Sequence, residues 1–399
     1  MVKPWDCSLI GDIFDFKNGL NKGKEFFGYG TPIVNYTDVY KKRALTQTDI
    51  KGKVYLEADE IKRFEARQYD VFFTRTSETP EEVGMSSVLL DNIDGCVFSG
   101  FVLRARPKNN ILFPGYCKYC FSTPEIRSAI ILGCTYTTRA LTNGKQLSAI
   151  SIPVPPYLEQ ERISEALSDI DNLIFSLEKL IAKKKAIKQG AMQELLTGKK
   201  RLPGFSGEWE YMALGKYGSL LKETINPQLY PSDYFWEYSM PAFDKNKCPV
   251  KQVGIDMHSN RTIIRGKVLL FNKLNVRQKR IWLVEQCREC ALCSSEFLPY
   301  RSDKINLGLL SQLLSTDIIT LDFIGMSTGT SNSQKRITPD DFLEYKVYLP
   351  IDKEEQTAIA SILSDMDSEI EALDEKLKKT RQVKQGMMQE LLTGRIRLV

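Results

Sequence analysis

Histidine is nearly missing from this chain of 399 residues, since His258 is its single example. One histidine excludes most His-based catalytic schemes and histidine-rich metal sites. No apolar run approaches the roughly 20 residues that a membrane span requires. The N-terminal stretch MVKPWDCSLIGDIF has no apolar signal core either. These absences lead us to expect a cytoplasmic protein with no membrane partner.

The sequence also lacks the motifs of nucleotide chemistry. It contains no P-loop, so we do not expect ATP hydrolysis. It has no glycine-rich methyl-donor loop after a strand and no Asn-Pro-Pro-aromatic motif of the kind that amino-methyltransferases use. The carboxylates Asp169, Asp171, Asp365 and Asp367 fall near the apolar stripe of long helices and read as structural. We therefore expect no catalytic residue and no cofactor, with catalysis left to partner subunits.

Nine cysteines, an odd number in a chain without a signal segment, indicate free thiols in a reducing compartment. Cys117 and Cys120, and Cys287, Cys290 and Cys293, have spacings that resemble metal sites. A four-cysteine zinc site joining two domains is conceivable, but the topology argued below places those domains at opposite ends of a rod. Buried free thiols are the preferred interpretation, and we expect no metal.

Composition otherwise describes an ordinary globular chain. Hydrophobic residues make up 42% and charged residues 26%, and the length suffices for two or three domains with cores of their own. The net charge of +5 permits a nucleic-acid partner without proving one.

One helical phrase occurs twice. KQGAMQELLTG at residues 188–198 returns as KQGMMQELLTG at residues 384–394, a shift of 196 residues (384 − 188). The similarity extends upstream, where QERISEALSDIDNLIFSLEKL (160–180) aligns with QTAIASILSDMDSEIEALDEK (356–376). A second echo joins WDCSLIG, which begins at Trp5, to WEYMALG, which begins at Trp209. The chain is therefore an internal duplication.

The repeated segments have the pattern of long coiled-coil helices. Apolar residues recur at alternating steps of four and three: Ile163, Leu167, Ile170, Ile174, Leu177 and Ile181, then Ile359, Leu363, Met366, Ile370, Leu373 and Leu377. Asp352 and Glu355 have capping-box spacing at the start of the second helix. Gly198 and Gly394, each followed by cations, predict left-handed helix ends. Each helix would contain roughly 40 residues and extend about 60 Å.

Topology follows from this arrangement. The first globular segment feeds the start of helix one, and the second leaves from its end. Helix two must therefore return antiparallel to bury its stripe, and its end, RIRLV, arrives near the chain start. The linker RLPGFSGEW (201–209) makes the equivalent join in the middle, so the architecture is nearly cyclic with a pseudo-two-fold axis. The alternative is two unrelated amphipathic helices in separate domains.

Each globular segment mixes strands with short helices and contains a polar stretch near its end. The two stretches are GCTYTTRALTNGKQLSAI and MSTGTSNSQKRITPDDFLEY. Hydroxyl, amide and cationic side chains of this kind bind base edges and phosphates. The candidates are Tyr136, Thr138, Arg139, Asn143, Lys145 and Gln146, then Asn332, Gln334, Lys335 and Arg336. The other interpretation is a solvated surface loop.

With these features, the chain resembles the DNA-specificity subunits of type I restriction-modification systems. The resemblance covers almost the whole length and rests on both helix-end phrases, on PPYLEQERI and PIDKEEQTAI, on GTPIVNYTDV (30–39) and on LPGFSGEW. It implies an α+β fold with two globular mixed α/β target-recognition domains (1–155 and 201–350). Two long antiparallel coiled-coil helices (156–200 and 351–399) would separate them. The second domain opens with KETINPQLYPSDYFWEYSMPAF rather than a copy of the first, so the two should read different DNA.

The resemblance implies sequence-specific binding of double-stranded DNA, one half of a split target per domain, without enzymatic activity. Further DNA-binding candidates are Thr74, Arg75 and Arg104 in the first domain and Asn272, Lys273, Arg277, Lys279 and Arg280 in the second. Two methyltransferase subunits would dock on the helices and restriction subunits would join through the complex. Candidate docking residues are Gln189, Gly190, Gln193 and Glu194, with Gln385, Gly386, Gln389 and Glu390. A coiled-coil protein scaffold and a metal-dependent nuclease are the competing hypotheses.

Overall fold

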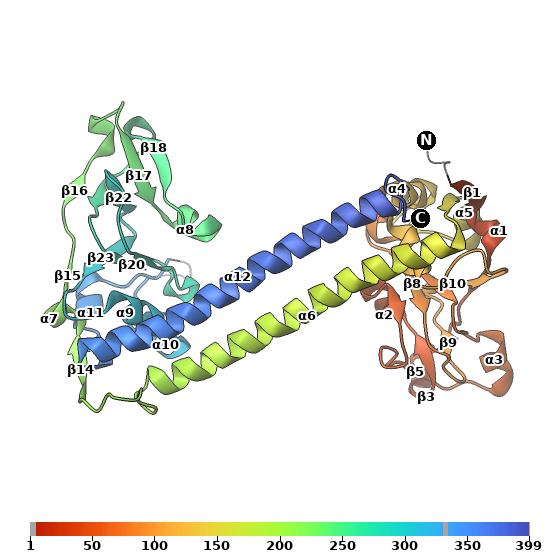
Figure 1. Cartoon of the computed structure of the whole chain (residues 1–399), viewed down its shortest axis with the longest axis horizontal. Helices are drawn as coiled ribbons and strands as arrows, with labels where there is room; N and C mark the ends of the chain where they lie inside the picture. The colour runs from red at the N-terminus through yellow and green to blue at the C-terminus, as the bar shows by residue number, and fades with distance from the viewer. Residues whose placement is uncertain (1–4, 330–333, 399) are drawn as a thin grey trace. The chain divides into compact units, whose positions relative to one another are not determined.

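The computed structural model describes residues 5–329 and 334–398 (Figure 1). The chain divides into two compact units: unit 1 comprises residues 1–178 and 375–399, and unit 2 comprises residues 179–374. The division cuts across two long helices, so each helix contributes one part to unit 1 and the other part to unit 2. Each unit is described by itself.

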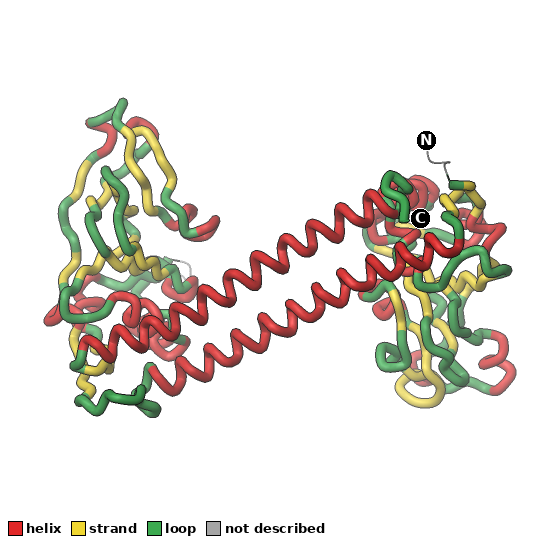
Figure 2. The backbone as a smooth tube through the Cα atoms, in the orientation of Figure 1, coloured by secondary structure: helices red, strands yellow, loops and turns green. Residues whose placement is uncertain are grey.

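The two long helices confirm the duplicated pattern. Helix α6 spans Tyr157–Leu195 and helix α12 spans Lys353–Leu391, with 39 residues in each. Figure 2 shows both as unbroken helices. Their apolar stripe is buried or half-buried along its length, with Leu167 and Leu363 fully buried. Gly198 and Gly394 follow the helix ends with φ of +69° and +72°, as the helix-stop pattern predicts.

Ion pairs show that the helices run antiparallel within each unit. In unit 1, Arg381 pairs with Glu178 at 2.6 Å, and Lys384 pairs with Asp171. In unit 2 the residues that occupy the same repeat positions are paired: Lys185 with Asp374 at 3.2 Å and Lys188 with Asp367 at 2.5 Å. Residue numbers rise along one helix as they fall along the other, so the predicted antiparallel arrangement is confirmed in both units.

Unit 1 is built around a five-stranded sheet of order β2-β10-β6-β8-β4. Its central strand β6, VFFT, is buried on both faces, as its run of apolar residues predicts. The strands of this sheet are β2 (Phe14–Asn18), β4 (Ala44–Leu45), β6 (Val71–Thr74), β8 (Ser86–Leu89) and β10 (Val102–Pro107). Smaller sheets contain β1 (Asp6–Leu9) with β13 (Ser151–Val154), β3 (Phe27–Val34) with β5 (Lys53–Val54) and β9 (Val97–Phe98), and β7 (Thr76–Ser77) with β11 (Thr135–Tyr136) and β12 (Ala140–Leu141). The short helices are α1 (Ile10–Ile13), α2 (Tyr36–Lys41), α3 (Ala58–Arg63), α4 (Pro124–Gly133) and α5 (Gly144–Ser148).

Unit 2 contains one four-stranded and one five-stranded sheet, of orders β15-β23-β20-β21 and β16-β19-β22-β17-β18. Their strands are β15 (Ser219–Leu220), β16 (Thr224–Ile225), β17 (Tyr234–Tyr238), β18 (Val250–Val253), β19 (Arg261–Ile263), β20 (Val268–Asn272), β21 (Ile281–Val284), β22 (Ala291–Ser294) and β23 (Phe297–Arg301). A separate pair joins β14 (Trp209–Ala213) to β24 (Lys346–Pro350), matching β1 with β13 in unit 1. The short helices are α7 (Leu214–Tyr217), α8 (Met240–Asn246), α9 (Leu307–Leu314), α10 (Asp317–Met326) and α11 (Pro339–Glu344).

The core of each unit includes both long helices. In unit 1, Leu167 from α6 and Leu391 and Leu392 at the end of α12 share one buried cluster with the main sheet. In unit 2, Leu195 and Leu363 occupy the equivalent cluster. Both long helices therefore belong to each core, because their buried leucines and the residues packed against them are removed from water together.

A buried glutamate closes the joint at the start of each helix. Glu159 is 3% exposed and accepts hydrogen bonds from Arg397 Nε (2.6 Å) and Nη2 (2.7 Å) and from Trp5 Nε1 (3.1 Å). Glu355 is fully buried and accepts from Arg201 Nε (2.7 Å) and Nη2 (2.6 Å). Asp352 does cap α12, since its Oδ1 accepts from the Glu354 amide at 2.8 Å, but the Glu355 carboxylate bonds to Arg201 instead of completing a capping box. The chain end, joined to Glu159, does imitate the internal linker.

The cysteines depart in part from expectation. Cys117, Cys120 and Cys293 are buried free thiols, but Cys290 is exposed at a position with φ of +53°, so the prediction of burial is wrong for Cys290. No cluster of three or more metal-ligating side chains occurs within the described ranges.

Among these same residues, no single helix is both long and apolar enough to cross a membrane. The bent pair α9–α10 meets that test by length and composition only, and five residues of α9 are buried in the core of unit 2.

Candidate nucleic-acid interface

The β11–β12 hairpin of unit 1 carries three of the predicted DNA-binding residues at the surface. Tyr136 is 57% exposed, and Thr138 and Arg139 are exposed beside it. The hairpin is closed by the Thr137 amide, which donates to the carbonyl of Arg139 at 3.3 Å. Within the described part of the chain, the Arg139 guanidinium has no hydrogen bond or ion pair. The hairpin therefore offers an unengaged cation to a ligand.

Arg139 stands on the rim of a hollow of about 410 Å³. The hollow is lined by residues from α2, from β7 and the turn that follows it, from the loop after β9, and from the hairpin: Tyr36, Tyr40, Thr76, Ser77, Glu78, Glu82, Phe101 and Arg139. Phe101 is 59% exposed, and the rings of Tyr36 and Tyr40 stack with centroids 5.8 Å apart. Aromatic side chains and arginine are enriched at protein interfaces.

Glu82 fixes one wall of this hollow. Its carboxylate accepts hydrogen bonds from Tyr40 Oη at 2.7 Å and from Ser77 Oγ at 3.1 Å. The bond to Glu82 raises the pKa of Tyr40, because it stabilises the neutral phenol. Thr74 is fully buried below, and its Oγ1 donates to the Glu82 carbonyl at 3.1 Å. Thr74 therefore supports the wall and does not present its hydroxyl to a ligand.

Two residues of the predicted polar loop serve the fold locally. Asn143 Oδ1 accepts from the Gln146 amide, and Gln146 Oε1 accepts from the Asn143 amide, which is a capping box at the start of α5. Gln146 Nε2 also donates to Thr135 Oγ1 at 3.1 Å, so it ties the helix to the hairpin. Lys145 lies between them and is exposed.

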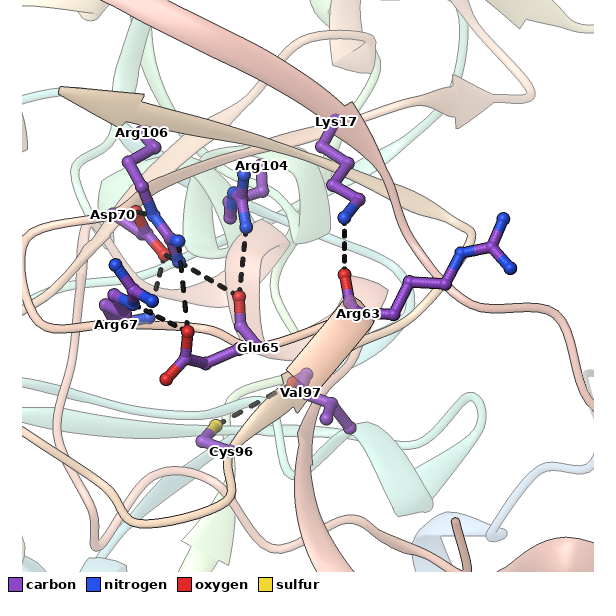
Figure 3. A network of polar contacts seen from close by, with 9 residues as sticks. All are labelled: Lys17, Arg63, Glu65, Arg67, Asp70, Cys96, Val97, Arg104 and Arg106. Atoms are coloured by element: carbon purple, nitrogen blue, oxygen red, sulfur yellow. Dashed lines mark hydrogen bonds and ion pairs between the residues drawn. The ribbon is translucent and has the colours of Figure 1, made fainter. Parts of the chain in front are cut away.

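Arg104 belongs to a structural network in unit 1 (Figure 3). It is 6% exposed, and its Nη1 donates to the Glu65 carbonyl at 3.1 Å. Neighbouring Arg106 donates to both carboxylate oxygens of Asp70, at 2.8 and 2.7 Å. Burial lowers the pKa of Arg104. We leave Arg104 out of the proposed interface because the structure does not place it at the surface.

Arg75 is half-buried and adjoins the hollow. Its backbone amide donates to the Phe101 carbonyl at 3.0 Å, and its carbonyl accepts from the Thr142 amide at 3.0 Å. The side-chain Nε is buried without a partner among the described residues. Arg75 thus joins the hairpin to the loop that carries Phe101.

In unit 2 several predicted cations are engaged in ion pairs. Arg280 forms a bidentate pair with Asp244 (2.8 and 2.7 Å), which lowers the pKa of that carboxyl. Lys279 pairs with Asp317 at 2.5 Å. Arg277 is exposed, at the tip of the turn that follows β20.

The remaining candidates of unit 2 are divided between interior and surface. Asn272 is 2% exposed and donates to the Glu296 carbonyl at 3.2 Å, so we leave it out of the interface. Arg336 pairs with the Glu296 carboxylate at 3.2 Å. Lys273 and Lys335 are half-buried and Gln334 is exposed, whereas Asn332 lies outside the described residues.

The predicted docking residues lie on exposed faces of the helices. A Cβ atom added to Gly190 or Gly386 would meet nothing within 4 Å, so packing inside the chain does not require these glycines. Beside them, Ile187 is 47% and Val383 is 55% exposed, at equivalent repeat positions. The other docking candidates are exposed, except half-buried Glu390: Gln189, Gln193, Glu194, Gln385 and Gln389.

A groove of about 790 Å³ accompanies α6 in unit 2. It is lined by Gln189, Met192 and Gln193 near the end of α6 and by Ile318 and Ile319 from α10. The lining therefore combines apolar and polar side chains.

Sequence reasoning missed Tyr36, Tyr40, Glu78 and Phe101. Tyr36 and Tyr40 lie in and just after GTPIVNYTDV, which the sequence marked only as part of a resemblance. Glu78 and Phe101 carry no local signal, because the hairpin pairing that brings Glu78 to the hollow joins residues about 60 positions apart.

Comparison with known proteins agrees with this architecture. The model of the type I restriction modification DNA specificity domain matches residues 2–189 and 293–381. The MjaVIII type I restriction enzyme specificity subunit of Methanocaldococcus jannaschii is 25% identical over 343 residues, which are 76% of this chain and 75% of that protein.

Two solved structures share the fold. The S subunit of a type I restriction-modification system from M. genitalium has a TM-score of 0.62 at 12% identity, covering 97% of this chain and 96% of that one. The HsdS subunit of Thermoanaerobacter tengcongensis has a TM-score of 0.50 at 15% identity, covering 99% and 98%.

Proposed function

This chain belongs to the family of type I restriction-modification DNA specificity domains, and from that membership we propose how its two units divide the reading of DNA. It acts as a specificity subunit that recognises a DNA target. Each unit reads one half of a bipartite site. The observation that carries this division is one duplicated scaffold that bears two unlike surfaces. The unit 1 hollow is lined from α2 and the β11–β12 hairpin, whereas unit 2 presents the basic turn after β20.

Affinity and discrimination come from different side chains. Exposed cations such as Lys145 and Arg277 contact phosphates, which supplies affinity that falls with salt. Side chains at the hollow contact base edges, which supplies sequence preference. In this proposal the recognition domains span residues 1–155 and 201–350, and the helical segments 156–200 and 351–399 set the distance between half-sites.

The exposed helix faces are the docking surfaces for methyltransferase subunits. Gly190 and Gly386 leave room for a partner helix to approach closely, and Ile187 and Val383 supply apolar contact next to each glycine. Because the two faces are related by the repeat, we infer two methyltransferase subunits, with restriction subunits joining through them. The chain itself is non-catalytic, requires no cofactor and works in the cytoplasm.

A binding selection tests the proposal. The full chain, purified with the methyltransferase of its host, is incubated with a randomised duplex library, and bound DNA is sequenced at several salt concentrations. We expect two conserved half-sites separated by a fixed gap. Arg139→Ala should change one half-site and Arg277→Ala should weaken contact at the other. A flat salt response without any consensus would favour the protein scaffold, and cleavage by this chain alone with Mg²⁺ would favour the nuclease.

A further inference from the structure

We propose that Arg139 and Glu78 together read a single G·C base pair in the major groove, with Arg139 on guanine and Glu78 on cytosine. The inference rests on the proposed function and adds to it the identity of one recognised base pair and the two side chains that select it.

The two side chains share the hollow yet remain unengaged. Both line it, one cationic and one anionic. Neither has a hydrogen bond or an ion pair within the described residues, although other carboxylates near cations in this unit are paired, as Asp70 is with Arg106. Opposite charges left apart in one site remain available to a ligand that offers both acceptors and a donor.

Strand register places the two residues next to each other. In the antiparallel pair β7–β12, Ala140 lies opposite Ser77 and Leu141 lies opposite Thr76. Arg139 precedes Ala140 and Glu78 follows Ser77, so the two occupy the next opposing position beyond the ladder. The last pair of the ladder, as directly opposed residues, has Cβ atoms about 4.5–5.5 Å apart, and Arg139 and Glu78 come directly after that pair. Their neighbouring positions suit two side chains that contact adjacent groups on the edge of one base pair.

A carboxylate on a DNA-binding surface requires an explanation, because phosphates repel it. Glu82 has one, since its two oxygens hold Tyr40 and Ser77. Glu78 is exposed and holds nothing in the described part of the chain. Cytosine provides the missing partner, because its N4 amino group donates in the major groove and is the base group that Glu side chains accept from.

The pattern on the base pair then selects the partner for Arg139. Guanine presents O6 and N7 as two adjacent acceptors, which match the forked guanidinium. In an A·T pair the adenine amino group would replace guanine O6, so Arg139 would keep only the bond to N7, and thymine O4 would face the Glu78 carboxylate as a second acceptor. The hollow therefore discriminates G·C from A·T through two unfavourable contacts at one base pair.

The surroundings fix the backbone segments that carry both side chains. Glu82 ties Tyr40 to the wall, the backbone bond of Arg75 to Phe101 anchors the loop after β9, and the ladder fixes the hairpin. A site held in advance by its own fold loses less conformational freedom when DNA binds.

The test compares substitutions in the full chain, purified with its methyltransferase, by the same selection from a randomised duplex library. Arg139→Lys retains the charge but loses the bidentate fork, and Glu78→Gln retains the shape but loses the charge. Both should relax the same single G·C position, by roughly 5- to 150-fold in discrimination against A·T. Lys145→Ala is the matched control, because it removes an exposed cation of the same unit outside the hollow. It should lower the affinity for all DNA sequences by the same factor.

The outcomes separate this inference from the proposed function. If the wild-type complex selects no bipartite site, the proposed function fails. If it selects one and the two substitutions relax different positions, or none, the G·C assignment alone is overturned. Hydrogen exchange of unit 1 amides in each variant, unchanged from wild type, confirms that lost discrimination reflects lost contacts and not unfolding.

Discussion

The tryptophan of one joint donates a hydrogen bond that its counterpart in the other joint does not make, and this difference predicts unequal effects of one substitution. Trp5 Nε1 donates to the Glu159 carboxylate at 3.1 Å. Trp209 occupies the equivalent position in unit 2, but its Nε1 is buried without a partner among the described residues. Replacing each Trp with Phe removes a hydrogen-bonded N–H at one joint and an unbonded buried N–H at the other.

The expected magnitudes follow from the cost of hydrogen bonds to charged groups. Trp5→Phe removes a bond to a carboxylate that is 3% exposed, which destabilises unit 1 by about 1.5–3 kcal/mol beyond the loss of packing. Trp209→Phe loses no bond and relieves a buried donor that has no acceptor, so the packing loss is partly offset. Both rings contact the glycine that ends a long helix, Gly394 or Gly198, so the packing terms are similar.

Hydrogen exchange measures each joint separately, which a single unfolding curve of a chain with two units does not. We expect amides in the last turns of α12 to lose protection in Trp5→Phe by about ten- to hundredfold more than those of α6 lose in Trp209→Phe. Equal losses at both joints would refute the reasoning, since they would show that the bond to Glu159 contributes nothing.

Three further predictions concern charge and helix packing. Bonds from Arg397 lower the pKa of Glu159. The ionised carboxylate therefore stabilises the folded state fully above the ordinary carboxyl pKa, and this stabilisation is lost as the pH falls through the lowered pKa. Glu159→Gln should flatten this acidic part of a profile of unfolding free energy against pH. Arg106→Ala leaves Asp70, 1% exposed, as an unpaired buried charge, which should destabilise unit 1 by about 3–5 kcal/mol in denaturant unfolding without altering the half-site that unit 2 reads. Gly190→Ala should stabilise the isolated chain by about 0.5–1 kcal/mol while weakening methyltransferase binding in a titration, and unchanged binding would remove Gly190 from the docking surface.

The helices could be predicted from sequence because their signals are local. Heptad spacing and the glycine after each helix depend on residues within a few turns of one another, so the sequence predicts the left-handed ends at Gly198 and Gly394 that the structure contains. The run VFFT indicates a strand equally plainly, because three apolar residues in a row precede a β-branched threonine, and this strand is buried on both faces.

Roles that depend on distant partners could not be predicted in the same way. No local pattern around Glu355 indicates that it pairs with Arg201, which is 154 residues away. The spacing between Asp352 and Glu355 indicates a capping box instead. Arg104 resembles a phosphate ligand in the sequence because the sequence does not show that its strand pairs with a neighbour on both sides. Glu78 was overlooked because its meaning depends on the register between two strands of two residues each.

The place of Leu391 and Leu392 in the core of unit 1 governs the order in which the protein can be completed. Unit 2 can close its joint once Glu355, 154 residues after Arg201, has been synthesised, whereas unit 1 must wait for side chains that are translated almost 400 residues after its first strand. At roughly 5–20 residues per second, that delay is about 20–80 s on the ribosome. The half of the protein that is synthesised first is therefore finished last, and until then its apolar surface stays open to chaperones and to aggregation.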